Sequence, residues 1–444
     1  ASVAHRMSDP SLRASAPLSH ALLRQAAHAR CGLLLAPQRA LTQACDVAGL
    51  HNWAVPADAA EPWQSVSGAV AWQAAAAEAG AISEGLERLA AAQVPLALQT
   101  RAQLLASGEA MLDETQFALF SQAQRAAPGA IWPMPQQGDD WFAQVHRLRF
   151  GEAPSSVWVP QELVGLGPRE GAARMPSTSS GLAAHRDSVH GPWLALLRAA
   201  QELLERDAFA VTWLHGLGGR ELPVPAHWAA RAQALGGTLR AFDLTQTWNP
   251  HPVIAMLGGA PMEGAPRWVL GLACRATLDA ALEKAALEWA QSLAFAGFML
   301  RERAHQLPRQ AADLRGFDEH AAFYSLRPEL WAELPLLAHA KPVNLNSCSS
   351  QYWLEHQQKL AAGLSTAEEV TGAAQPRNSM RGLGGVQDHD EPGAQSEVKS
   401  DAQKQVDADL RAAKPQLQAL TQQLHGAGIE LLYRELTTRD VAAA

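Results

Sequence analysis

The chain has 444 residues, of which 48% are hydrophobic, and it carries a net charge of −8. This is enough for two or three packed lobes, and the absence of any Lys/Arg run argues against a nucleic-acid binder. Charges interrupt every long apolar stretch, and the start lacks an apolar core of signal-peptide length, which excludes a bilayer span or signal peptide and predicts a cytoplasmic protein. The four cysteines have no metal-site or C-x-x-C spacing, so free thiols are expected.

The first half of the chain predicts helices and strands in alternation. Residues 1–30 read as a loose, polar tail, and a strand-like stretch starts at Cys31. An Ala-rich segment predicts one long helix over 73–95, and residues 97–125 are expected to continue helical. Alternating apolar and polar residues over 141–159 predict a pair of strands.

The second half predicts two more long helices, over 188–214 and 278–304, with strands at 238–242, 253–257 and 268–273 between them. Strands and long helices in this order predict an α+β fold, with mixed or antiparallel sheets packed against long helices.

Residues 364–409 are poor in apolar residues and rich in turn formers, which predicts a mobile loop or flexible insertion. A helix is expected over 410–424 and a strand over 429–436. The last residues bring no closing element, so we expect the chain to be cut short at Ala444.

One sequence motif occurs twice in the chain and predicts its chemistry. Residues 84–88 and 202–206 both read Glu-x-x-Glu-Arg within predicted long helices. Residues three and four apart share one helix face, so each copy points two carboxylates and an arginine the same way. On an exposed Ala-rich helix such a pattern is commonly a solvated face, but the second copy has strongly apolar flanks that predict burial, and buried carboxylates need partners.

Four converging carboxylates repel one another unless hard cations neutralise them. Mg²⁺ prefers a few carboxylate oxygens together with phosphate oxygens, and arginine binds phosphate bidentately. The sequence has no G-x-x-x-x-G-K-[ST] motif. These residue types therefore predict a nucleoside triphosphate site without a P-loop.

Several motifs in the same order resemble those of the YcaO family of ATP-dependent cyclodehydratases. They lie at 77–88, 177–181, 202–209 and 281–291, and shorter matches follow at 318–324 and 435–441. The resemblance covers residues 31–444, implies one YcaO-like catalytic domain, and implies that its long helices converge on an ATP site. The segment 318–324 is similar to one found in azoline-forming members.

The resemblance also implies roles for individual residues. Residues implied to bind ATP are Glu84, Glu87, Arg88, Ser177, Ser180, Glu202, Glu205, Arg206, Glu288 and Gln291. The implied Mg²⁺ ligands are Glu84, Glu87, Glu202 and Glu205, and the implied catalytic residues are Glu202, Glu205 and Arg206. The general base is not identified by the sequence, and His185 and His320 are candidates by position alone.

The chain departs from the family's pattern at several positions. Gly80 stands where the family has serine, Ser180 where it has asparagine, and His185 where it has glycine. The family's Gly-basic-Gly turn is Ser67–Ala69 here, without the basic residue, and the family's proline-rich tail is missing.

The implied function is ATP-dependent activation of backbone amides in a ribosomally made precursor peptide, which cyclises Cys, Ser or Thr to azolines. The implied partners are this peptide, a separate ubiquitin-activating-like protein that binds its leader, a flavin-dependent dehydrogenase and a second copy in a homodimer. Neither nucleic acid nor a membrane is expected as a partner. Two alternatives stay open: thioamide formation, and a non-catalytic scaffold that binds the peptide, which the departures favour.

Overall fold

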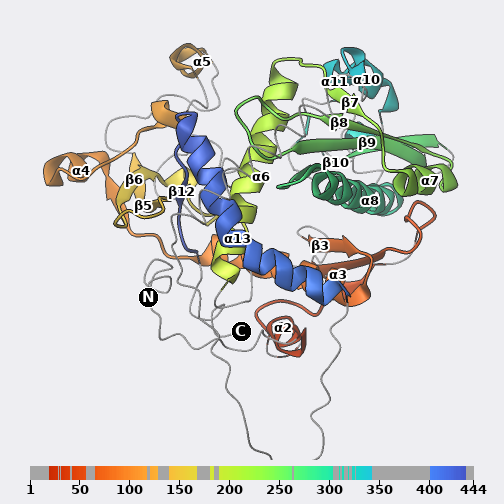
Figure 1. The fold of residues 1–444 in the computed structure, drawn as a ribbon, viewed down its shortest axis with the longest axis horizontal. Helices are drawn as coiled ribbons and strands as arrows, with labels where there is room; N and C mark the ends of the chain where they lie inside the picture. The colour runs from red at the N-terminus through yellow and green to blue at the C-terminus, as the bar shows by residue number, and fades with distance from the viewer. Residues whose placement is uncertain are drawn as a thin grey trace, which may run out of the picture.

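The computed structural model describes the greater part of the chain, and the account below refers to that part. The described residues are 20–28, 30, 32–40, 43–56, 66–117, 121–128, 140–167, 181–184, 190–262, 265–303, 310, 313–314, 319, 323–325, 327–342 and 401–436. They form three sheets with long helices packed against them (Figure 1).

The largest sheet has the order β10-β9-β8-β7-β11. Its strands are β7 (Arg220–Leu222), β8 (Thr238–Asp243), β9 (Val253–Met262), β10 (Ala265–Cys274) and β11 (Lys341–Pro342). Neighbouring strands are antiparallel except β11, which runs parallel to β7. β9 and β10 pair over ten residues, so that the end of β10 lies beside the start of β9.

Both faces of this sheet are buried, each against a long helix. Ile254 and Met256 of β9 face a core shared with α8 (Leu278–Arg303) and α7 (Ala226–Ala234). Ala255 and Leu257 alternate with them and face a second core shared with α6 (Gly191–Leu214) and α13 (Asp401–Gly426). The sheet thus holds α6 and α8 on opposite sides (Figure 1).

A close approach fixes α8 on β10. A Cβ at Gly271 would lie 2.2 Å from both the Ala285 oxygen and the Trp289 nitrogen, so only glycine fits there. Ser292 Oγ also donates to the Leu270 carbonyl at 2.9 Å. These contacts set where the outer face of α8 points.

The three-stranded sheet packs against α3, the helix with the first Glu-x-x-Glu-Arg motif. Its strands are β1 (Gln38–Arg39), β2 (His51–Pro56) and β3 (Val66–Ala71), and α3 (Ala74–Gln93) packs on β2 and β3. Helix α2 (His20–Ala26) lies against α3, where Arg24 donates two hydrogen bonds, of 2.8 and 2.6 Å, to the buried Glu78 carboxylate. β3 also contacts α8, which brings α3 and α8 together.

The remaining sheet has the order β12-β5-β4, with β6 beside β5. Its strands are β4 (Leu98–Thr100), β5 (Trp141–Arg147), β6 (Ser156–Pro160) and β12 (Leu432–Tyr433). The short helices α4 (Arg101–Ser107), η1 (Glu114–Phe117) and α5 (Gln122–Ala126) come between β4 and β5 in the chain, and η2 (Gln161–Leu163) follows β6. Two further short helices, α10 (Pro328–Glu333) and α11 (Pro335–Ala338), pack near α6 and β10.

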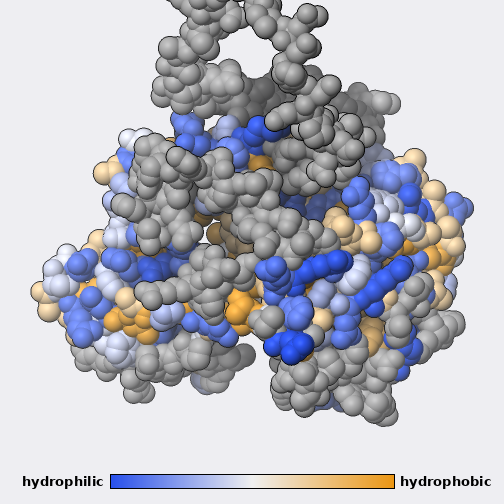
Figure 2. All heavy atoms as spheres, turned by 90° about the horizontal axis from the view of Figure 1, so that it is seen from below, coloured by the Kyte–Doolittle hydropathy of each residue, from blue (hydrophilic) through white to orange (hydrophobic). Residues whose placement is uncertain are grey.

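Polar and apolar side chains both reach the surface of the described residues. Hydrophilic side chains gather over two regions of the face seen in Figure 2, with apolar ones between them. The exposed large hydrophobic residues of the described part are Leu105, Leu166, Leu214 and Leu217. No described helix has the length and hydropathy that a membrane crossing requires.

The α+β prediction is confirmed, and the three long helices, the strand pair and the three later strands lie where they were expected. The predicted free thiols are confirmed for Cys45 and Cys274, whereas Cys31 and Cys348 lie outside the described residues.

Other predictions were wrong. Residues 97–125 are not one helical stretch but β4, α4, η1 and α5, because Thr100 caps α4 and Gly108 ends it with φ +70°. The 1–30 tail contains α2, whose Leu23 and Ala26 are buried, and the described residues after Cys31 form no strand before β1.

The predicted flexible insertion is also partly wrong. Its last nine residues, 401–409, belong to α13, while 364–400 lie outside the described residues. The expected strand over 429–436 is reduced to the two residues of β12.

Candidate active site

The first Glu-x-x-Glu-Arg motif lies on the face of α3 next to β3. Glu84 accepts a hydrogen bond from Arg88 Nη2 at 2.5 Å and another from the backbone N–H of Gly68 at 2.8 Å. The i, i+4 pair within the helix and the strand amide together fix the direction of this carboxylate.

The second copy repeats this arrangement on α6. Glu202 accepts from Arg206 Nη2 at 2.6 Å and from the backbone N–H of Leu182 at 2.6 Å. Leu182 can come this close because Gly181 lies directly on α6, where a Cβ would be 1.9 Å from the Ala199 oxygen. The two copies are therefore alike in structure as well as in sequence.

The second glutamate of each motif is more deeply buried, and other carboxylates lie near it. Burial, with Glu202 and Glu84 nearby, raises the pKa of Glu87 to about 7. Burial, with Glu288 nearby, raises the pKa of Glu205 to about 7, although Glu205 Oε2 accepts from the Cys274 amide at 3.0 Å. Burial also raises the pKa of Glu202, with Glu288 and Glu84 adding to the rise. The carboxylates of α3, α6 and α8 thus face one another.

Helix α8 contributes Glu288 and Gln291. Lys284 Nζ lies 2.6 Å from Glu288 Oε1, again four residues apart on the helix. Gln291 Nε2 donates to the carbonyl of Gly68 at 3.0 Å. Because the Gly68 amide donates to Glu84, this one residue of β3 joins the α3 and α8 parts of the site.

The departures at Gly80 and Ala69 explain each other. A Cβ at Gly80 would lie 2.8 Å from the Cβ of Ala69, which is closer than two carbon atoms can pack. The alanine on β3, where the family's turn has glycine, occupies the space that a serine on α3 would need. Gly80 and Ala69 thus fit each other, and the contact between α3 and β3 is filled.

Restoring the serine alone should destabilise the protein. Overpacking costs about 1–3 kcal/mol, more than the roughly 0.5 kcal/mol gained by removing a glycine from a helix. We expect Gly80→Ser to lower the urea midpoint and Ala69→Gly in the same chain to restore most of the loss. Additive effects of the two changes in a double-mutant cycle would show that these positions do not compete for space.

The geometry suits Mg²⁺ bound together with a nucleotide. Among the described residues, no group of three His, Cys, Asp or Glu side chains is close enough to hold a metal ion by itself. Mg²⁺ is usually held by one or two carboxylates, with phosphate oxygens and water as its other ligands. Burial, with neighbouring carboxylates adding to it, raises the pKa of Glu87, Glu202 and Glu205, and a bound cation would favour their charged forms.

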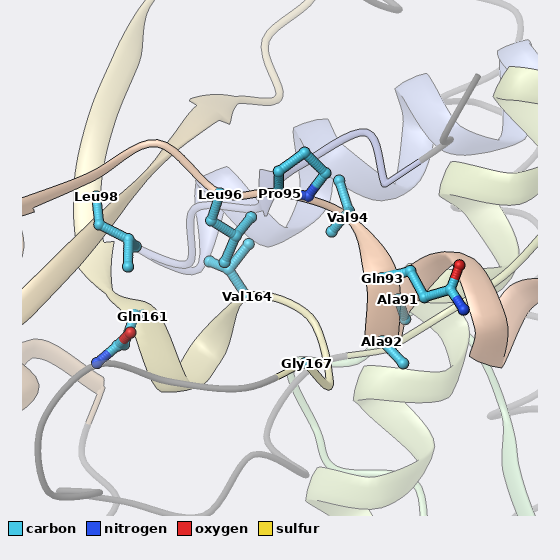
Figure 3. A pocket seen from close by; sticks show the side chains of 10 residues that line it. All are labelled: Ala91, Ala92, Gln93, Val94, Pro95, Leu96, Leu98, Gln161, Val164 and Gly167. Carbon is cyan, nitrogen blue, oxygen red and sulfur yellow. The ribbon is translucent and has the colours of Figure 1, made fainter. Parts of the chain in front are cut away.

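A separate cavity of about 300 Å³ lies at the carboxyl end of α3 (Figure 3). Its lining includes Ala91, one helical turn beyond Glu87, and Val164 and Gln161 beside β6. None of the predicted site residues that the structure describes lines it. The cavity therefore adjoins the carboxylates through α3 without containing them.

Several predicted residues lie outside the described part of the chain, namely Ser177, Ser180, His185 and His320. The sequence analysis missed Lys284, whose i, i+4 spacing to Glu288 was a usable signal. It also missed the backbone donors of Gly68, Leu182 and Cys274, for which sequence gives no signal because any residue carries an amide.

The fold and site define an α+β protein with paired carboxylates and an arginine on each of two helices, α3 and α6, and a Lys–Glu pair on a third, α8. Residues 71–444 match the family described as YcaO cyclodehydratase, ATP- and Mg²⁺-binding, and the chain belongs to that family. ATP and Mg²⁺ are accordingly its cofactors. A search of curated proteins found no match.

Solved structures include similar chains. A heterocyclase in complex with substrate and cofactor is 18% identical with a TM-score of 0.56, over 99% of this chain and 53% of that one. The chain thus spans about half the length of that heterocyclase, whose likeness shows the fold.

Two further structures are less similar. The YcaO from Methanopyrus kandleri bound with AMPPCP and Mg²⁺ is 17% identical, with a TM-score of 0.46 over 71% of this chain and 72% of that one. The E. coli microcin synthetase McbBCD complex with pro-MccB17 bound is 17% identical, with a TM-score of 0.47 over 74% and 81%.

Proposed function

We propose that the chain uses ATP and Mg²⁺ to activate backbone amides of a ribosomally made precursor peptide and closes Cys, Ser or Thr side chains onto the preceding carbonyl as azolines. The observation that carries the proposal is the convergence of Glu84 and Glu87, Glu202 and Glu205, and Glu288 from three helices of a YcaO-family chain.

Ring closure needs an activated oxygen. The peptide thiol or hydroxyl adds to the carbonyl carbon, and the former carbonyl oxygen must then leave, which it does poorly as hydroxide and well as phosphate. ATP supplies the phosphoryl group when bound, and Mg²⁺ offsets the charge on the phosphates. The overall change is loss of one water from the peptide for each ring, with ATP converted to ADP and phosphate.

The chain's own residues would bind Mg²⁺ and orient the phosphates of ATP. Glu84, Glu87, Glu202 and Glu205 would hold Mg²⁺, and Arg88 and Arg206 would reach phosphate oxygens. Both arginine side chains are about half exposed, 51% and 45%, and each is already held by its own helix. Lys284 keeps Glu288 in place beside Glu205. A network of this kind orders the phosphates before reaction and so lowers the cost of positioning.

The matched exchange at Gly80 and Ala69 favours an active enzyme over the scaffold alternative. The packing between α3 and β3 is kept although the serine is absent. Both glutamates and the arginine of each copy remain in place.

The finer arrangement is also proposed. The substrate is a Cys-, Ser- or Thr-rich precursor peptide, delivered by a separate ubiquitin-activating-like protein that binds its leader. The chain acts as a homodimer in the cytoplasm, and a flavin-dependent dehydrogenase oxidises the rings afterwards.

Mass spectrometry of the peptide tests this function. Incubation of the purified chain with ATP, Mg²⁺, partner and precursor peptide should remove one water for each ring formed, and Glu202→Gln should remove none. An exchange of oxygen for sulfur when sulfide is supplied would instead indicate thioamide formation. Peptide binding with neither ATP turnover nor a mass change would establish the scaffold and overturn the proposal.

A further inference from the structure

A second pair of arginines lies beside the carboxylates, outside the Glu-x-x-Glu-Arg motifs. Arg198 precedes Glu202 by four residues and Glu205 by seven on α6, so all three share one helix face. Arg275 directly follows β10 and belongs to no motif. The two arginines are linked through Gln201, which contacts Arg198 and His251, and through the Cys274 thiol, 3.9 Å from the His251 carbonyl. Burial, with the charge of Arg275 adding to it, lowers the pKa of Arg198.

Arg275 is anchored next to the Cys274–Glu205 contact by its backbone, and its side chain uses few of the hydrogen bonds that it can donate. The Cys274 amide donates to Glu205, and the Arg275 amide donates to the Pro252 carbonyl at 3.2 Å. Its guanidinium donates one hydrogen bond, from Nη1 to the Cys274 carbonyl at 2.6 Å. Within the described residues, no carboxylate lies at ion-pair distance from it, so the other N–H groups of the fork are available.

Arg198 is held by a buried polar network. Its Nη1 donates to Gln201 Oε1 at 2.8 Å. Because the guanidinium can only donate, the Gln201 amide oxygen accepts, and its Nε2 must therefore donate to His251 Nδ1, 3.2 Å away. Gln201 and His251 are 0% and 1% exposed, which fixes the direction of the arginine from inside the protein.

Among the described residues, Arg198 has one ion-pair partner and Arg275 has none. Burial, followed by the charge of Arg275, lowers the pKa of Arg198 to about 10. The carboxylate nearest to Arg198 is Asp409 of α13, at 3.4 Å and 42% exposed. Two guanidinium groups that are held in place and keep unused N–H donors can bind an anion with several acceptor oxygens, once Mg²⁺ offsets the charge of the neighbouring carboxylates.

We infer that Arg275 and Arg198 bind a phosphate group at the Glu205 end of the carboxylate cluster. The inference rests on the proposed function, and it adds two phosphate-binding residues that lie outside the paired motifs. Two sources share this chemistry: the terminal phosphate of bound ATP, and the orthophosphate that remains after ring closure. The competing explanation is that Arg275 only balances Glu205, whose pKa it lowers.

Nucleotide binding by Arg275→Gln tests the inference. Calorimetry with Mg²⁺ should show a non-hydrolysable ATP analogue bound about tenfold to a hundredfold more weakly than by the wild type, as expected for one lost charge-assisted contact. ADP should bind with less than about a threefold change if the terminal phosphate is the ligand. Arg275→Lys, which keeps the charge without the fork, should fall between wild type and Arg275→Gln.

A separate titration tests whether orthophosphate is the ligand. If that is the ligand, both nucleotides bind normally to Arg275→Gln, while titration of orthophosphate into the Mg²⁺–ADP complex shows a loss of about tenfold or more. Arg411→Gln is the matched control, because it removes one positive charge from an exposed position of α13. It should leave all three affinities unchanged.

The remaining outcomes overturn the inference. Unchanged binding of all three ligands by Arg275→Gln would do so, as would an equal loss for all three together with a lower unfolding temperature. If Glu202→Gln abolishes nucleotide binding in the same assay, the proposed site stands and only the arginine pair is wrong. If the wild type binds no nucleotide, the proposed function fails with it.

Discussion

Glu202→Ala should abolish Mg²⁺-dependent ATP binding. Glu202 is the most connected carboxylate of the site: it pairs with Arg206, accepts the Leu182 amide and faces Glu288 and Glu84. Its removal takes away a proposed Mg²⁺ ligand and the anchor of the segment that begins at Gly181. We expect affinity for a non-hydrolysable ATP analogue to fall on the order of a hundredfold or more, measured by calorimetry with Mg²⁺.

Two further variants make this result specific. Glu202→Gln keeps the size and the acceptor for the Leu182 amide but removes the charge, so it should lose nucleotide while unfolding at the wild-type temperature. Glu109→Ala removes an exposed carboxylate and should change nothing. Wild-type affinity in Glu202→Ala would disprove the site assignment.

The protein without Mg²⁺ should become less stable as the pH rises from about 5 to about 7. Glu87 and Glu205 have a pKa of about 7 in the folded chain against an ordinary value of 4.5, so between these values the folded state binds more protons than the unfolded state. Stability then falls with rising pH, which is the reverse of ordinary acid denaturation. Below pH 4.5 this contribution is fully present, and above pH 7 it is lost.

Cations should remove this decline. Mg²⁺ with nucleotide neutralises the carboxylates, so the urea midpoint at saturating ligand should stay level or rise over the same range. Binding itself should strengthen with pH, by roughly tenfold per unit for each proton displaced.

The glutamate double variant is the control. Glu87→Gln with Glu205→Gln should fall in stability less than the wild type as the pH rises in the presence of a chelator, because the contribution of these two side chains is removed. His146, whose pKa burial lowers, opposes the trend below pH 6.5 and remains in both proteins. A wild-type midpoint that rises between about pH 5 and 7 in chelator would contradict the coupling of these carboxylates.

The ion pairs of the candidate site could be predicted where the sequence signal is local. The Arg88–Glu84 and Arg206–Glu202 pairs follow from helix periodicity alone, since residues four apart meet on any helix. The Lys284–Glu288 pair obeys the same rule. Arg275 and the amides of Gly68 and Leu182 could not be predicted in this way, because their place depends on strand pairing and loop packing across many residues.

The same division holds for the fold. Long helices such as α3, α6 and α8 were predictable because 3.6-residue periodicity persists over many turns. The prediction of one helical stretch over 97–125 was wrong because the segment, although rich in Ala and Leu, contains several short elements with their own caps. α2 was missed because its helix is short and is held by tertiary contacts, including the pair between Arg24 and the buried Glu78.

The amino-acid sequence alone determined the family, the two Glu-x-x-Glu-Arg helices and the residue types that suit Mg²⁺ and phosphate, since each is a local pattern. The tertiary structure decided that these helices face one another, that Gly68 links α3 to α8, and that Ala69 fills the space opposite Gly80. It also decided that the hydrogen-bonded network of Arg198 reaches Cys274, whose amide donates to Glu205 and which precedes Arg275. Such relations arise from sheet register and helix packing, which join residues far apart in the chain.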